Sequence, residues 1–136
     1  MITLRVVGLL YFISGLWCAL KAGLAGSYVG YDMSSDIAQA EFVTVYGGLQ
    51  VGLGIAMILG SLKKDTITGT LLVAFVFSLT LAAARLISVT MYPSIIAETG
   101  VWFMAKLEIA MAIALGFAFY RNGNKATAPQ GSMIAQ

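Results

Sequence analysis

The chain has 136 residues, of which 60% are hydrophobic and only 10% are charged. A water-soluble domain typically carries about 25% charged residues. The 8 basic and 6 acidic residues here are too few to cover a hydrated surface, so the composition argues against a soluble monomer. The mild net charge of +2, without a basic patch interleaved with aromatic residues, also argues against a nucleic-acid partner.

The residue types that are missing limit the chemistry. The chain has no histidine and one cysteine, Cys18. Haem, zinc and di-iron sites that depend on histidine, Cys–His nucleophile pairs and an intrachain disulfide are therefore not expected. The sequence also lacks a nucleophile elbow, a P-loop and a Rossmann glycine pattern. We expect no catalytic residue, no metal site and no dedicated cofactor, and hence a protein that is not an enzyme.

Four apolar stretches organise the chain. They cover about residues 4–24, 36–60, 67–89 and 100–120, and no proline lies inside them. Each is long enough to cross a bilayer as a helix, which needs about 20 residues. The sequence predicts an all-α fold: an integral membrane four-helix bundle of up-down-up-down topology. One domain would cover residues 1–121, and residues 122–136 would form a polar, flexible cytoplasmic tail.

The first stretch has an alternative interpretation as a cleaved signal peptide. It has a basic residue, Arg5, before a long apolar run, and small residues at Gly23 and Ala25. The apolar run is longer than that of a usual signal peptide, and Lys21 interrupts the approach to a cleavage site. We therefore expect the first helix to remain in the mature protein.

The distribution of external charges predicts the orientation in the membrane. Residues 25–38 and 89–100 contain no lysine or arginine, whereas the other side carries five basic residues: Arg5, Lys63, Lys64, Arg121 and Lys125. Loops rich in lysine and arginine stay in the cytoplasm. Both termini are therefore expected to be cytoplasmic.

Local residue chemistry agrees with these boundaries. Ser34 and Ser35 are suitable caps for the second helix, and Asp36 suits the positive end of its dipole. Aromatic residues gather at membrane interfaces. By position along the chain, Tyr11 and Tyr120 are expected nearer the cytoplasmic interface.

Five charged residues lie within the apolar stretches: Lys21, Glu41, Arg85, Lys106 and Glu108. By helical rise, all five fall in the outer half of the bundle. Charges in a bilayer are costly unless they reach the interface or pair with one another. These residues would therefore extend to the head groups, form a buried ion-paired network or line a ligand cavity. We expect Glu108 to face Arg85, and Lys106 to point toward a neighbouring helix or the interface.

The second stretch carries the sharpest local pattern. Gly48 and Gly52 form a G-x-x-x-G face, which allows close helix packing. Tyr46 and Gln50 share another face four residues apart. One interpretation gives Tyr46 and Gln50 interhelical hydrogen bonds. The other makes them the floor of a pocket that Glu41 and Arg85 open.

Two segments resemble a known family. Glu41 with the Tyr-Gly-Gly run at 46–48, and the AAARLIS segment at 82–88, resemble small bacterial membrane proteins grouped as domain of unknown function 4345. That family is similar to DoxX-like four-helix proteins. The resemblance covers about residues 4–120 and implies a multi-pass protein of the bacterial inner membrane. It also implies an accessory role in a redox complex, with Glu41, Gly47, Gly48 and Arg85 as the matching positions.

Three functional hypotheses follow from these features. The first is a non-catalytic binding or accessory protein whose charged outer-half pocket holds a small amphipathic ligand, a lipid head group or a quinone. The second is a structural subunit of a larger membrane complex. The third is a small proton-coupled transporter that depends on Glu108. The expected partners are membrane lipids and either further copies of the chain or other membrane proteins.

Overall fold

The computed structural model describes residues 1–97 and 99–126, which are mostly helical with no strand in these ranges. The elements are α1 (Ile2–Leu20), α2 (Ala22–Tyr28), α3 (Asp36–Phe42), the π-helix η1 (Val43–Gly48), α4 (Leu49–Gly60), α5 (Lys64–Met91), the 3-10 helix η2 (Pro93–Ala97) and α6 (Thr99–Ala126). Four segments are apolar and long enough to cross a membrane: Ile2–Leu20, Asp36–Gly60, Lys64–Met91 and Gly100–Asn124. The all-α fold and the four spans are confirmed, which supports a multi-pass membrane protein.

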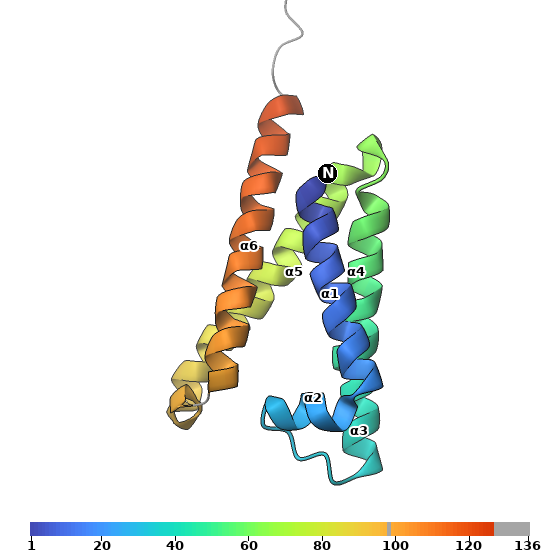
Figure 1. The fold of residues 1–136 in the computed structure, drawn as a ribbon. Helices are drawn as coiled ribbons and strands as arrows, with labels where there is room; N and C mark the ends of the chain where they lie inside the picture. Colours follow the sequence, from blue (N-terminus) through green and yellow to red (C-terminus); the bar gives the residue numbers. More distant parts are fainter. Residues whose placement is uncertain (98, 127–136) are drawn as a thin grey trace, which may run out of the picture.

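The spans are arranged as two pairs. α1 packs along η1 and α4, whereas α5 packs along α6, and the two pairs share a smaller contact area. Figure 1 shows the pairs closest where the chain starts and diverging toward α2. Two contacts mark the first end, which we call the N-terminal end. The Met1 amine donates to the Ser61 carbonyl at 3.2 Å, and Asn122 Nδ2 donates to Thr68 Oγ1 at 2.8 Å. We call the opposite end the α2 end.

Glycine allows the α1–α4 pair to pack closely. Gly8 and Gly15 on α1 are seven residues apart, as are Gly47 and Gly54 on the opposing helix, so each couple shares one helix face. A Cβ atom added to Gly54 would lie 2.5 Å from the Gly8 carbonyl oxygen and 2.6 Å from the Phe12 nitrogen. Such contact with backbone atoms leaves no room for a side chain. The absence of side chains thus sets the helix separation.

The expected role of Gly48 and Gly52 in packing is wrong within the chain. Both are exposed, and a Cβ atom added to Gly52 would have no neighbour within 4 Å. Successive residues on a helix are rotated by about 100°. Gly48 therefore points away from α1, which Gly47 contacts through Ala19. The G-x-x-x-G spacing is present, but its face lies on the outside of the molecule.

Several expected boundaries also change. α1 ends at Leu20 rather than at residue 24, because Lys21 has φ −132° and ψ 43°, which are not helical, and α2 then turns across the end of the pair (Figure 1). α6 continues to Ala126, so residues 122–126 of the expected flexible tail are helical. The rest of that tail, 127–136, lies outside the described residues. The predicted cap is confirmed, because Ser35 Oγ accepts a hydrogen bond from the Ala38 amide at 3.1 Å.

Apolar packing is uneven along the bundle. The larger core joins all four spans and contains Leu4, Val7, Tyr11, Met57, Leu71, Ala74, Met111, Leu115 and Ala118. The second core is smaller and contains Cys18, Ala25 and Phe42 near the α2 end. The larger core therefore lies in the half of the bundle nearer the N-terminal end. Nearer the α2 end, the space between the two pairs is bordered by the charged side chains of Arg85 and Glu108.

Candidate functional site

A bidentate ion pair joins α5 to α6. Arg85 Nη2 donates to Glu108 Oε1 at 2.7 Å, and Arg85 Nε donates to Glu108 Oε2 at 3.0 Å. The side chain of Glu108 is 8% exposed and that of Arg85 is 29% exposed. Two parallel charge-assisted hydrogen bonds fix both position and orientation. The pairing of Glu108 with Arg85 that the sequence predicts is present.

Arg85 also borders a cavity of about 350 Å³ that lies toward the α2 end. The cavity is lined from α2 and the following turn, from α5, and from η2 and α6: Ser27, Tyr28, Val29, Gly30, Arg85, Ile95, Gly100, Val101 and Met104. This volume is at the small end of the range of ligand pockets. The guanidinium is the charged group in its lining.

A smaller void of about 50 Å³ lies on the side of Glu108. Its lining includes Tyr11 and Ser14 from α1, Gln50 from α4, and Glu108 from α6. A void of this size and polarity has room for ordered water. The ion pair therefore has one member on each of two spaces, the larger of which faces the α2 end.

Aromatic residues cover the neighbouring part of α3 and η1. The Tyr31 and Tyr46 hydroxyl groups are hydrogen-bonded at 2.6 Å, and the Phe42 and Tyr46 rings stack with their centroids 4.7 Å apart. Both tyrosines lie near enough to Arg85 to interact with it electrostatically.

The structure brings together four of the seven predicted site residues. Arg85 and Glu108 are paired, Gln50 shares the smaller void with Glu108, and Tyr46 is within electrostatic range of both charged groups. The other three, Lys21, Glu41 and Lys106, are exposed and are not part of a buried network.

The position of each of these three residues in the fold explains why it lies outside the buried network. Lys21 lies at the break between α1 and α2, and Glu41 lies in the short helix α3 at the edge of the bundle. Lys106 is two residues from Glu108, which places it about 200° around the helix from the buried side. Glu41 is exposed and is not among the residues that line either cavity, so the expected opening of the pocket by Glu41 is not observed.

Sequence reasoning missed two parts of the site. Tyr11 was expected at the cytoplasmic interface, but it is 4% exposed and its hydroxyl is hydrogen-bonded to Ser78 Oγ at 3.1 Å across the two pairs. A serine in the middle of the third span was a usable signal for this contact. The backbone turn after α2 was the second omission, because the break at Lys21 that brings it over the cavity has no clear sequence signal.

The arrangement offers hydrogen-bond donors rather than reactive groups. Both oxygens of Glu108 accept from Arg85, and no cluster of three or more potential metal ligands occurs within residues 1–97 and 99–126. A guanidinium carries five N–H donors, and the pair with Glu108 uses two of them. Arg85 therefore retains donors for an acceptor oxygen placed in the larger cavity.

Comparison with protein families assigns the chain to one of them. A family model described as "Domain of unknown function (DUF4345)" matches residues 1–119. The chain belongs to this family. The DUF4345 match includes the ion pair, both cavities and nearly all of the fourth span. No curated protein and no solved structure matches the chain significantly.

Proposed function

We propose that this DUF4345 protein is a non-catalytic binding or accessory protein of the bacterial inner membrane. Its ligand would be a small amphipathic molecule held at the α2 end by Arg85. The observation that carries this proposal is the fixed Arg85–Glu108 pair beside a cavity of about 350 Å³. The resemblance of the DUF4345 family to DoxX-like proteins, on which this part of the proposal rests, favours a quinone or a lipid over a water-soluble ligand.

The chemistry of the pair supports a ligand with an acceptor oxygen. Glu108 fixes the guanidinium, so the remaining donors of Arg85 are preorganised and less side-chain entropy is lost on binding. A quinone carbonyl or a lipid phosphate supplies such an oxygen. The apolar side chains of Ile95, Val101 and Met104 line the same cavity and suit the rest of the molecule. Its tail would leave between the two helix pairs.

The proposal includes an orientation. In an up-down-up-down bundle with cytoplasmic termini, the basic N-terminal end lies inside and the α2 end outside. Cysteine labelling in intact spheroplasts tests this in a Cys18→Ala background. We expect a membrane-impermeant maleimide to label Ser34→Cys directly and Asp65→Cys only after lysis. The reverse pattern would invert the orientation.

Ligand binding is tested with the purified full-length protein in detergent. The probes are decylubiquinone and a short-chain phosphatidylethanolamine, and the readout is the thermal unfolding midpoint. We expect one of the two probes to raise the midpoint of the wild type. Arg85→Lys keeps the charge but loses the bidentate geometry, so it should reduce the shift at least severalfold.

Lys106→Gln is the matched control, because Lys106 is an exposed cation on α6 outside the site. It should respond to the probe as the wild type does. Equal shifts of the unfolding midpoint in the wild type and Arg85→Lys would show that the ligand does not bind at Arg85. No shift with either probe would overturn the ligand class.

A structural role in a larger membrane complex is the second candidate, and one observation favours it. The face with Gly48 and Gly52 is open on the outside of α4, where small residues permit another helix to approach. Gly52→Leu should then weaken a homo-oligomer or a hetero-complex recovered by native purification. The transporter hypothesis has no such support, because both oxygens of Glu108 are engaged by Arg85.

A further inference from the structure

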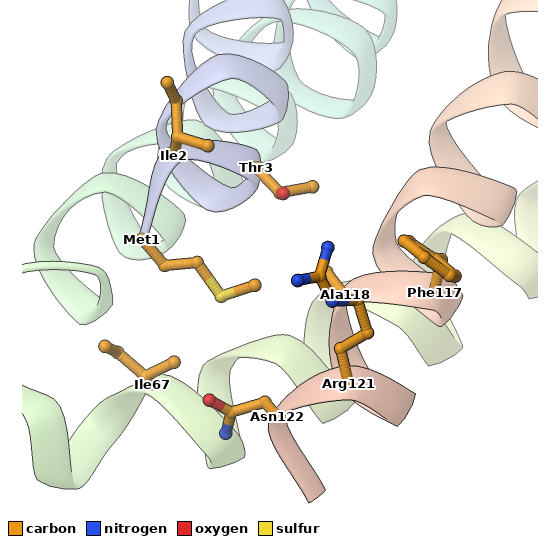
Figure 2. A pocket seen from close by; sticks show the side chains of 8 residues that line it. All are labelled: Met1, Ile2, Thr3, Ile67, Phe117, Ala118, Arg121 and Asn122. Carbon is orange, nitrogen blue, oxygen red and sulfur yellow. The ribbon is translucent and has the colours of Figure 1, made fainter. Parts of the chain in front are cut away.

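A third cavity, of about 350 Å³, lies at the N-terminal end, between α1, α5 and α6. Its walls are mainly apolar and include Ile2, Ile67, Phe117 and Ala118 (Figure 2). We call this space the N-terminal crevice. It lies at the end of the bundle opposite Arg85, so it is independent of the site described above.

Arg121 is the charged side chain that lines the N-terminal crevice. Figure 2 shows the Arg121 guanidinium turned from α6 toward Thr3 on α1, so that it borders the space between the two helices. The guanidinium carbon lies 5.5 Å from the centre of the Phe117 ring. No carboxylate is among the residues that line the crevice. A positive group thus stands beside an apolar space.

The surroundings of the crevice are also basic. Arg5 and the pair Lys63 and Lys64 lie at the same end of the bundle, where the described residues include one acidic side chain, Asp65. Arg121 lies three residues before the end of the fourth span, Gly100–Asn124. In a helix that crosses a bilayer, such a position corresponds to the level of the lipid head groups. Phe117 lies one helical turn deeper, at the level of the first acyl carbons.

We propose that the N-terminal crevice binds an anionic phospholipid of the phosphatidylglycerol class. The phosphate would accept hydrogen bonds from Arg121 and Thr3, and one acyl chain would lie between Phe117 and Ile67. Basic pockets between membrane helices bind anionic head groups in this way. The positive charge of Arg121 favours an anionic lipid over a zwitterionic one. The apolar walls favour a lipid over a free phosphate.

Native mass spectrometry of the full-length protein tests the proposal. The probes are dilauroyl phosphatidylglycerol and dilauroyl phosphatidylcholine, which differ in head-group charge and not in chain length. We expect the wild type to retain phosphatidylglycerol preferentially. Arg121→Gln should lower its affinity about tenfold, as loss of one charge-assisted contact implies. Lys64→Gln removes an exposed cation at the same end that does not line the crevice, and it should stay within twofold of the wild type.

A second variant separates the crevice from simple surface charge. Thr3→Phe fills the space from α1 and leaves Arg121 in place, so it should also lose phosphatidylglycerol. Equal retention of the two lipids, or equal losses in Arg121→Gln and Lys64→Gln, would overturn the proposal. Stabilisation by glycerol 3-phosphate alone would point to a soluble anion instead. A dimer that Thr3→Phe dissociates would make the occupant a second copy of the chain.

Discussion

The two helix pairs are held together by different means. α1 and α4 approach through Gly8, Gly15, Gly47 and Gly54, whose missing side chains bring one backbone against the other. α5 and α6 are joined by side chains. The Arg85–Glu108 ion pair links them toward the α2 end, and the stacked rings of Phe75 and Phe119 link them toward the N-terminal end.

The two kinds of contact differ in what they can offer to a ligand. In a contact between helix backbones the polar groups are already hydrogen-bonded within each helix, so they are not available to a ligand. Such a contact also leaves little room for a larger side chain. A side-chain contact such as the ion pair exposes part of its hydrogen-bonding capacity and can exchange partners. The α1–α4 pair is therefore in backbone contact, and the α5–α6 pair holds the ion pair that borders the cavity.

The largest expected effect comes from breaking the glycine contact. Gly54→Leu forces a side chain against the backbone of Gly8 and Phe12, so it should lower the free energy of unfolding by about 3 kcal/mol. Thermal unfolding in detergent measures the effect. Gly52→Leu, measured on the monomeric protein, is the matched control two residues away, because there the added side chain meets open space within the chain. Equal losses in the two variants would remove the distinction between the two glycine faces.

The ion pair should give the second-largest effect. Arg85→Leu leaves a buried carboxylate without a partner and should cost about 2 kcal/mol, reduced from the value for a fully buried pair because Arg85 is 29% exposed. Adding Glu108→Leu should recover most of that loss, since no charge then remains to be desolvated. Lys106→Leu should stay within about 0.5 kcal/mol of the wild type. A double variant no more stable than Arg85→Leu would contradict a specific pair.

The contact between the two pairs should matter less. Ser78→Ala removes the partner of the buried Tyr11 hydroxyl and should cost about 1 kcal/mol. Ser88→Ala is the control on the same helix, because that hydroxyl donates within α5, to the Ala84 carbonyl. If Ser78→Ala were neutral and Ser88→Ala were not, the two pairs would not be joined through Tyr11.

The smallest effect is expected in the aromatic cluster beside the site. Tyr31→Phe removes the hydrogen bond to the Tyr46 hydroxyl and should cost about 0.5 kcal/mol, because the contact is exposed. Tyr92→Phe, at an exposed tyrosine beyond the end of α5, is the control. A loss of more than about 2 kcal/mol would show that the cluster supports the fold and not only the border of the cavity.

The general fold could be predicted because it depends on composition and length. Four apolar stretches of the right length define four spans, and the capping residue Ser35 marks the start of one of them. The ion pair could be predicted as well, since Glu108 has a short side chain and Arg85 lies at the same depth. The energetic cost of an unpaired charge in a membrane and the depth of each residue along its helix were enough to predict this pair.

The remaining features depend on the backbone. The π-helix Val43–Gly48 and the break at Lys21 are local departures from regular helix geometry that hydrophobic periodicity does not record. The glycine face that packs against α1 could be identified only from the structure, because Gly47 and Gly48 are adjacent in sequence but point about 100° apart. The spacing of seven residues between Gly8 and Gly15 indicates the packing face of α1. The prediction instead relied on the more familiar spacing of four residues, which Gly48 and Gly52 have.

Photo-cross-linking with a quinone that carries a photoreactive group on its ring tests the central claim most directly. The protein would be labelled in detergent and the modified residues mapped by mass spectrometry, in the wild type and in Arg85→Lys. The account predicts that the label is lost in Arg85→Lys and that, in the wild type, it lies on the residues that line the cavity beside Arg85: Ser27, Tyr28, Val29, Gly30, Ile95, Gly100, Val101 and Met104. Label spread over the exposed faces of the spans, or unchanged in Arg85→Lys, would contradict the account.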